Sequence, residues 1–448
     1  MSPSPPRDPN SPANGAPREE GARTSESPSA SGTERDRLRS AAWRIVLLFG
    51  IVSLFADVTY EGLRSVVGQY LALLGASAAV VGTLAGLGEL LGYLLRLVGG
   101  YLADRTRYHW LLTAVGYAIN LFSVPALGLV HSWPPAAALV LAERAGKGLR
   151  TPPRDALLSY ATKQVGRGKG FGIHEAMDQI GALTGPLFAA LLLGLGFGYR
   201  TTLFAYALPA TLALLALFLV WRFFPRPDLL EPGAGEPSAE KEGSPREPRS
   251  QILPPHETSA QDGTAPPRAF SREFWGFLLF AALAAAGFLH FQLIGFHFAR
   301  GGLAPEITPL LYALAMGVDA VFALVAGLLY DRIGILVLGI VPFLTVGAAA
   351  ALFLPSEAGL GVSLLGMVLW GGAMGLHESV LRAAVADLTP PERRGFGYGV
   401  FNTVYGLALF ASGILFGILY GLGGTYVVLG VAVLEVLALG VLAVVFLR

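Results

Sequence analysis

The stretch FGIHEAMDQIGALTGPLFAA, residues 171–190, decides how the rest of the chain is interpreted. It is apolar enough to lie in a membrane, yet it contains the ionisable residues His174, Glu175 and Asp178. On a helix with about 3.6 residues per turn, one stripe about 60° wide holds His174, Asp178, Gly181 and Gly185. Small residues four apart let another helix approach closely. Pro186 predicts a bend, because its ring nitrogen cannot donate a hydrogen bond.

Ionisable side chains in this stretch need an explanation, because each costs roughly 2.5–3.5 kcal/mol at membrane depth on insertion scales. Such residues usually mark a transport pathway or a coupling site. We therefore expect Asp178 to be functional, and Gly181 and Gly185 to serve helix packing. The alternative is a kinked packing helix whose charges form only structural pairs.

The composition sets the class of protein. Of 448 residues, 53% are hydrophobic and 14% are charged, against about 25% charged in a typical soluble domain, which excludes an ordinary soluble enzyme. The formal net charge of +1, without a basic stripe, argues against a nucleic-acid partner. The absence of cysteine excludes disulfides, thiolate metal sites and thiol nucleophiles. The first forty residues lack the apolar core of a signal peptide.

Polar and apolar stretches divide the chain into four parts. Residues 1–38 are predicted to be a disordered cytoplasmic tail, and residues 224–271, rich in Pro, Glu, Gly and Ser, a flexible cytoplasmic linker. Residues 39–223 and 272–448 each contain six apolar segments of about 20 residues or more, long enough to span a bilayer as helices. The predicted segments are 41–70, 79–103, 109–130, 135–158, 169–194, 200–223, 272–299, 306–330, 335–354, 359–386, 395–421 and 424–447.

The two halves share short motifs in the same order. GYLADR at residues 100–105 matches GLLYDR at residues 327–332, each at the end of the second segment of its half. GKGFG at residues 168–172 matches RRGFG at residues 393–397, each opening the fifth segment. A parallel repeat of six-helix units is a transporter architecture with its substrate site between the halves.

Lysines and arginines of the short loops gather on one side of the predicted membrane. That side has Arg35, Arg37, Arg39, Arg44, Arg105, Arg107, Arg150, Arg154, Lys163, Arg167, Lys169, Arg332, Arg393 and Arg394. The other side has little besides Arg200 and Arg300. This bias places both termini and the linker in the cytoplasm, with the chain a multi-pass protein of the plasma membrane, or of the inner membrane if the cell is bacterial.

GYLADRTRYH at residues 100–109 resembles the loop signature G-x-L-x-D-R-x-G-R-R/K of the major facilitator superfamily. The later glycine is absent, and Tyr108 or His109 stands where a basic residue is usual. The resemblance implies an all-α membrane protein with twelve transmembrane helices in two pseudo-repeated six-helix bundles. It also implies a cytoplasmic gate, at Gly100, Asp104, Arg105, Arg107, Asp331 and Arg332, that pairs charges across the halves. The alternative is a tight charged turn that only fixes topology.

Two further motifs resemble signatures of this superfamily, the first of them a signature of its proton-driven antiporters. The spacing of Gly172, Gly181, Gly185 and Pro186 is similar to their glycine-proline motif, with alanines at the two later glycine positions. LAERAGKGLRTPP resembles the fourth-helix signature R-x-x-x-G through Arg144 and Gly148. The first implies an interface helix, and the second implies a role of Arg144 in proton coupling. A pair of Arg144 with Glu143 is disfavoured, because neighbours on a helix do not face each other.

Acidic and basic residues on one face of the first helix complete a predicted proton-coupling set. Two acids and a base there can partly neutralise each other, and a desolvated carboxylate can exchange a proton near neutral pH. The predicted set is Asp57, Glu61, Arg64, Arg144 and Asp178. The alternative is a structural ladder that holds the first helix to its neighbours.

Aromatic, amide and histidine side chains predict a cavity for a small, amphipathic organic molecule. The predicted cavity residues are His174, Glu175, His290, Gln292, His297, Trp370, His377, Glu378, Asn402 and Tyr405. Ordinary packing explains them nearly as well.

Enzyme motifs fail. HEAMD at residues 174–178 lacks the second histidine of a zinc site, and GRGKGFG lacks the ending of a phosphate loop. We expect no enzyme activity, no metal and no cofactor other than a proton gradient.

The sequence predicts a monomeric, proton-coupled antiporter that exports a small organic molecule by alternating access. The alternatives are a proton-coupled importer (symporter) of a small metabolite or anion, and a non-transport membrane sensor with the same fold.

Overall fold

The computed structural model describes residues 30–226, 270–355, 359–390 and 393–446, without the side chains of residues 30–36 and 167. Most of the predicted tail (1–29) and linker (227–269) lies outside the described residues. The first helix begins at Ala30, so residues 30–38, which we expected in the tail, are helical. Ala30, Glu34, Arg35, Arg37 and Leu38 in this stretch are good helix formers.

The N-terminal half crosses the membrane six times. Its helices are α1 (Ala30–Leu73), α2 (Ala78–Thr106), α3 (His109–Leu127), α4 (Trp133–Val165), α5 (Arg167–Gly194), α6 (Tyr199–Ala205) and α7 (Ala207–Phe223). The sixth crossing consists of α6 and α7, which are separated only at Tyr206.

The C-terminal half repeats this order of crossings. Its elements are α8 (Arg272–Gly287), α9 (Phe291–Arg300), α10 (Ile307–Ile333), the 3-10 helix η2 (Gly334–Ile340), α11 (Val341–Phe353), α12 (Leu360–Leu388), α13 (Arg394–Leu422) and α14 (Gly424–Phe446). The helices α8 and α9 form one crossing with a break at residues 288–290.

The twelve predicted segments all coincide with crossings of the structure. Length and hydropathy alone select ten candidate spans in the described residues. One of these, 307–353, contains two crossings, and α4 is missed because it carries too many charged residues. The twelve-helix fold in two six-helix bundles is therefore confirmed.

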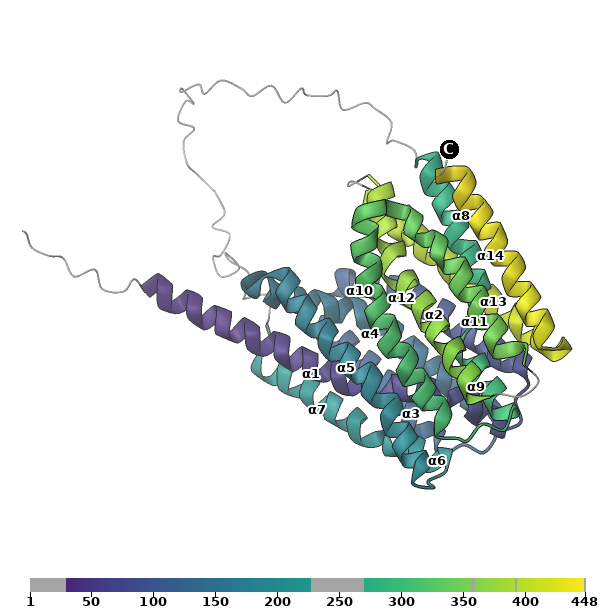
Figure 1. Ribbon diagram of the computed structural model, residues 1–448. Helices are drawn as coiled ribbons and strands as arrows, with labels where there is room; N and C mark the ends of the chain where they lie inside the picture. Colours follow the sequence, from purple (N-terminus) through teal and green to yellow (C-terminus); the bar gives the residue numbers. More distant parts are fainter. Residues whose placement is uncertain (1–29, 227–269, 356–358, 391–392, 447–448) are drawn as a thin grey trace, which may run out of the picture.

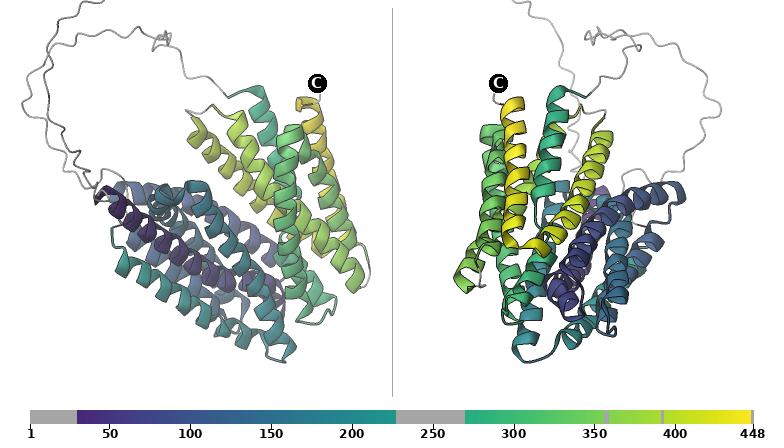
Figure 2. Two further views of the ribbon diagram at one scale, coloured as in Figure 1. Left: turned by 60° about the vertical axis from the view of Figure 1, so that its left-hand side comes forward. Right: turned by 90° about the vertical axis from the view of Figure 1, so that its right-hand side faces the viewer.

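The two halves converge at one end and diverge at the other (Figure 1). The diverging ends are those where α8 begins and α14 ends, as the two views of Figure 2 also show. At the converging ends, Gln69 Nε2 of α1 donates to Thr308 Oγ1 of α10 over 2.6 Å. A Cβ added to Gly194 of α5 would lie 3.8 Å from Cβ of Glu306. The structure is thus sealed at this end and open at the other.

Glycines let α2 of one half touch α13 of the other. A Cβ added to Gly82 or Gly413 would collide with backbone of the facing helix, so only glycine permits this approach. By contrast, Gly181 and Gly185 of α5 pack against backbone of α1 within the same half. The packing role of these two glycines agrees with the structure, but the helix they hold is not in the other half. Pro186 lies inside α5, which continues to Gly194.

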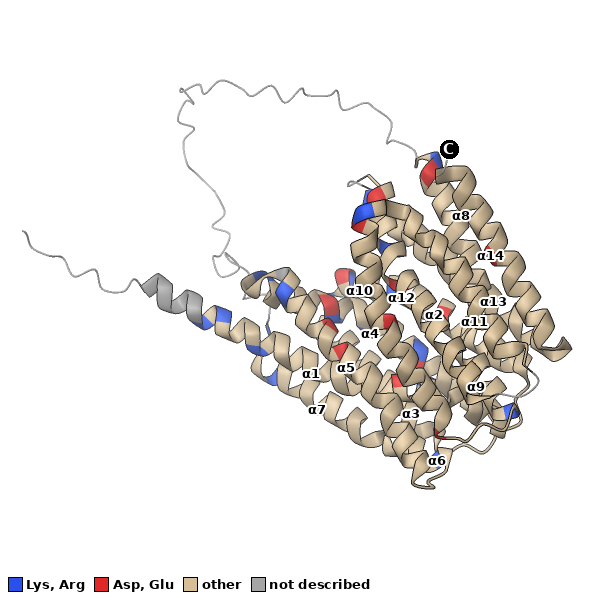
Figure 3. Cartoon of the chain, in the orientation of Figure 1, with Lys and Arg blue, Asp and Glu red and all other residues tan. Residues whose placement is uncertain are grey.

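Charged residues have a clear distribution over this frame (Figure 3). They lie near the diverging helix ends and in the interior between the halves, while the outward faces are mostly uncharged. Large apolar side chains such as Leu187, Leu324 and Val436 are exposed on those outward faces. This pattern is that of helices surrounded by lipid.

Candidate functional site

A central cavity lies between the halves. It consists of two adjoining chambers of about 240 and 250 Å³ that share Arg64, Arg96, Met374, Glu378 and Arg382 as wall residues. Helices α1, α2, α4 and α5 supply most of its charges, whereas α9, α12, α13 and the break at residues 288–290 supply most of its aromatic side chains. The cavity therefore has a charged wall from one half and a mainly aromatic wall from the other.

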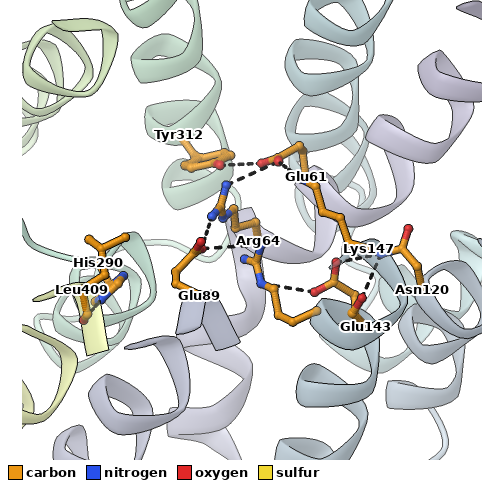
Figure 4. A network of polar contacts seen from close by, with 10 residues as sticks. Glu61, Arg64, Glu89, Asn120, Glu143, Lys147, His290, Tyr312 and Leu409 are labelled. Carbon is orange, nitrogen blue, oxygen red and sulfur yellow. Dashed lines mark hydrogen bonds and ion pairs between the residues drawn. The ribbon is translucent and has the colours of Figure 1, made fainter. Parts of the chain in front are cut away.

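Arg64 is the centre of the charged wall (Figure 4). Its guanidinium pairs with Glu61 on α1, 3.4 Å away, and with Glu89 on α2. Lys147 Nζ on α4 lies 3.6 Å from the same oxygen of Glu61. The other Glu61 oxygen accepts a 2.6 Å hydrogen bond from Tyr312 on α10. Glu61 thus joins α1 and α4 of its own half, and through Arg64 also α2, to α10 of the C-terminal half.

Arg144 extends this network away from the cavity. It lies 3.6 Å from Glu89 and, through Nε, 3.3 Å from Oε2 of its neighbour Glu143. Asn120 on α3 donates to Glu143 over 2.9 Å. The pair of Arg144 with Glu143, which the sequence disfavours, is therefore present, because the long arginine side chain reaches back along its own helix. The network has three acids and three bases, so that each buried charge has a counter-charge.

Four of the five predicted coupling residues, namely Asp57, Glu61, Arg64 and Asp178, line one chamber, and Arg144 lies apart from them. Asp57 and Asp178 line the same chamber, together with Lys147. Asp57 packs where Gly181 of α5 meets α1. Arg144 does not line that chamber but a smaller one of about 120 Å³ beside it. Glu89 connects Arg144 to the chamber, because it pairs with both Arg64 and Arg144.

His174 supports Asp178 rather than lining the cavity. Its Nε2 lies 3.8 Å from Asp178 Oδ2 and 3.2 Å from Ser53 Oγ, and its side chain is buried. Glu175, the next residue, does line the chamber of Asp57 and Asp178. The predicted stripe of α5 is thus present, with His174 as a buried neighbour of the carboxylate.

Arg150 and Lys147 were missing from the predicted site. Arg150 is 2% exposed, and its guanidinium carbon lies 4.0 Å from the ring centroid of Tyr117 and 5.6 Å from that of Tyr60. Its Nε and Nη1 have no hydrogen-bond partner among the described residues. Lys147 Nζ lies 3.7 Å from the Tyr60 centroid. Their spacing on α4, with Arg154 one turn further on, was the available signal, since residues three and four apart share a helix face.

The aromatic wall surrounds Trp370. Phe288 stacks on it with ring centroids 5.4 Å apart, and Trp370 Nε1 donates to the carbonyl of Leu289 over 2.8 Å. His377 Nδ1 lies 2.9 Å from the hydroxyl of Tyr405. The predicted cavity residues that line this chamber are His290, Gln292, Trp370, His377, Glu378, Asn402 and Tyr405. His297 does not line it but lies 3.1 Å from the Tyr420 hydroxyl.

The break between α8 and α9 brings backbone to the aromatic wall. The carbonyl of Phe288 accepts a 2.6 Å hydrogen bond from Ser412 Oγ, and that of Leu289 is held by Trp370. His290 Nε2 in turn donates to the carbonyl of Leu409 over 2.9 Å. Irregular backbone at membrane depth persists only where such partners satisfy it, so these side chains fix the shape of the cavity.

The predicted gate residues lie at the diverging ends of α2 and α10. Arg107 ends α2 with φ 57°, and Arg105 Nη1 donates to the Tyr101 hydroxyl over 2.7 Å. No ion pair within the described ranges joins Asp104 to Arg332, or Asp331 to Arg105 or Arg107, so a charge latch is not formed in this conformation. The same ranges hold no cluster of three His, Asp or Glu residues that could bind a metal ion.

Two pseudo-repeated helical halves around a charged and aromatic cavity define a multi-pass membrane transporter, not an enzyme. The sequence profile of the Major Facilitator Superfamily matches residues 47–413, and the chain belongs to this superfamily.

Relatives and solved structures agree with that assignment. An uncharacterised protein of Mycobacterium tuberculosis is 41% identical over 405 residues, covering 89% of this chain and 92% of that protein. An uncharacterised MFS-type transporter of Methanocaldococcus jannaschii is 28% identical over 84% of this chain and 88% of its own. Multidrug resistance protein MdtH of Aeromonas hydrophila is 29% identical, over only 46% of this chain and 51% of its own. The fold is similar to the nucleoside transporter NupG (D323A mutant), with a TM-score of 0.68, 15% identity, and coverage of 90% and 100%.

Proposed function

We propose that this transporter is a proton-coupled antiporter that exports a small, amphipathic organic molecule by alternating access. The observation that carries the proposal is the placement of Asp57 and Asp178 in one chamber with Lys147 nearby. Protonation of a buried carboxylate removes a charge from the cavity. It therefore shifts the equilibrium between the conformation open at one end and the conformation open at the other. The aromatic wall around Trp370 suits the apolar part of a substrate.

Export is favoured by two observations. The glycine-proline spacing of α5 is similar to that of proton-driven antiporters, and the partial relative MdtH is named for multidrug resistance. The arginine-rich loops favour a cytoplasmic location for both termini, in the plasma membrane. The open end would then face the cytoplasm, where an exporter takes up its substrate.

The test is transport by purified protein in proteoliposomes with an imposed pH gradient, on compounds first selected by ligand-dependent melting. Asp57→Asn and Asp178→Asn should each abolish gradient-driven transport and spare exchange of substrate for substrate. Asp387→Asn is the matched control, because Asp387 lies outside the cavity, where it accepts a hydrogen bond from the Tyr330 hydroxyl. Unchanged gradient dependence in both cavity variants would contradict the proposed coupling site.

A second candidate is uptake of a small anion together with protons. It is favoured by cavity arginines without an ion-pair partner in the described part of the chain, namely Arg96, Arg150 and Arg382. A bound anion would offset the positive charge of these arginines, and protonation of Asp57 or Asp178 in the same chamber would remove a negative charge that repels the anion, so the binding of the anion and of the proton would favour each other. Growth of a deletion strain on candidate anionic nutrients, against its resistance to a panel of toxic compounds, separates uptake from export.

A further inference from the structure

A groove unrelated to the central cavity runs between α3 and α7 on the outer face of the N-terminal half. Its volume is about 510 Å³, and it is lined mainly by apolar side chains. Leu111, Phe218 and Trp221 are 59%, 51% and 46% exposed. In a membrane, these side chains face lipid, and the tryptophan lies near the helix end, where aromatic residues anchor a protein at the bilayer surface.

One end of this groove is positively charged. Arg107, which lines it, is exposed and has no ion pair among the residues that the structure describes. Its left-handed backbone ends α2 and starts the turn into α3. Trp110 Nε1 donates to the carbonyl of Pro225 over 3.0 Å, which brings Arg226 to the same end. A single acid, Asp104, accompanies Arg105, Arg107, Arg222 and Arg226 in residues 101–112 and 214–226.

We propose that this groove is a binding site for an anionic phospholipid, with an acyl chain between α3 and α7 and the phosphate at Arg107. The apolar part of the groove, along α3 and α7, matches the acyl chain, and its basic end matches the phosphate. The basic end lies at the helix ends, the level where headgroups meet hydrocarbon. A basic residue near an anionic membrane surface contributes about 1 kcal/mol, or about fivefold in affinity. Trp110 is held in place by stacking on Phe49, with centroids 6.0 Å apart, so the groove is preformed.

The site can be tested without a transport substrate, since Trp110 and Trp221 line it. Purified full-length protein in detergent is titrated with phosphatidylglycerol or phosphatidylcholine that carry identical brominated acyl chains, which quench tryptophan fluorescence on contact. The quenching that belongs to the groove is the part that is present in the natural protein and absent from the double variant Trp110→Phe/Trp221→Phe. We expect phosphatidylglycerol to quench it at about fivefold lower lipid fraction than phosphatidylcholine.

Variants assign this selectivity to the basic end. Arg107→Gln should remove most of the preference, Arg107→Lys should keep it, and Arg300→Gln, at the opposite membrane surface, should leave it unchanged. If Arg107→Gln does not fold, Arg226→Gln, which is outside any helix, should weaken the preference on its own. Equal quenching by both lipids, or a preference that survives Arg107→Gln, would overturn the proposal. Neither result depends on proton coupling or on the transported molecule.

Discussion

Removing the Tyr312 hydroxyl should open the sealed end of the protein. This hydroxyl donates over 2.6 Å to Glu61 and is buried between the halves. A hydrogen bond to a charged group contributes about 1.5–3 kcal/mol. If Tyr312→Phe removes that contribution only from the conformation seen here, the ratio of the two end states should move by roughly 10- to 150-fold toward the other one.

Spin-label distance measurements can detect this change. The natural chain contains no cysteine, so that cysteines at Phe197, in the loop after α5, and at Arg300, the last residue of α9, can be labelled at the sealed end without further changes. We expect Tyr312→Phe to increase the fraction of long distances between the labels. The control is Tyr330→Phe, which removes a 2.8 Å hydrogen bond to Asp387 within one half. An unchanged distance distribution in Tyr312→Phe, or an equal change in the control, would refute the reasoning.

Three more predictions follow from packing and charge. Gly82→Val should destabilise the protein by about 1–3 kcal/mol through overpacking against the facing helix, which is measured as a lower melting temperature. The control Gly440→Val should leave the melting temperature unchanged, because no atom lies within 4 Å of the added Cβ. Glu89→Ala should cost about 3 kcal/mol of unfolding free energy in denaturant titrations, since it leaves two arginines without their shared carboxylate. Arg96 and Glu378 lie on opposite walls of the cavity, so Arg96→Glu and Glu378→Arg should each slow transport about fivefold. The double variant restores opposite charges and should recover the rate of transport. A double variant that stays slow would show that the two side chains do not meet when the open end closes.

The fold was predictable because each crossing is long and apolar, a signal that depends only on neighbouring residues. The apolar segment was recognisable even in α4, although its six charged residues between 143 and 155 keep it from meeting a simple hydropathy criterion. The break at residues 288–290 was not predicted. No proline marks it, and it is held by side chains from other helices, such as Ser412 and Trp370.

The candidate site was predictable only in part, because His174 and His297 do not line the cavity, whereas Lys147 and Arg150 line it and were not selected. The placement of Asp57 and Asp178 in one chamber agrees with the expected stripes on the first and fifth helices. The partners of Arg144 could not be inferred, because Glu89 is more than fifty residues away and reaches it only through the packing of α2 on α4. Arg150 was not selected because its partners are the rings of Tyr60 and Tyr117. A search of the sequence for residues of opposite charge does not find such a contact.

The interrupted crossing in the C-terminal half has a mechanical consequence. Phe291 and Gln292, in the first turn of α9, line the chamber, and the backbone of Gln292 and Phe296 presses against Gly68 where the two bundles are shut. No helical hydrogen bond has to break for α9 to tilt about residues 288–290. A molecule that displaces Phe288 or Phe291 would therefore move α9 as one rigid helix of ten residues. The backbone of this helix closes the sealed end at Gly68.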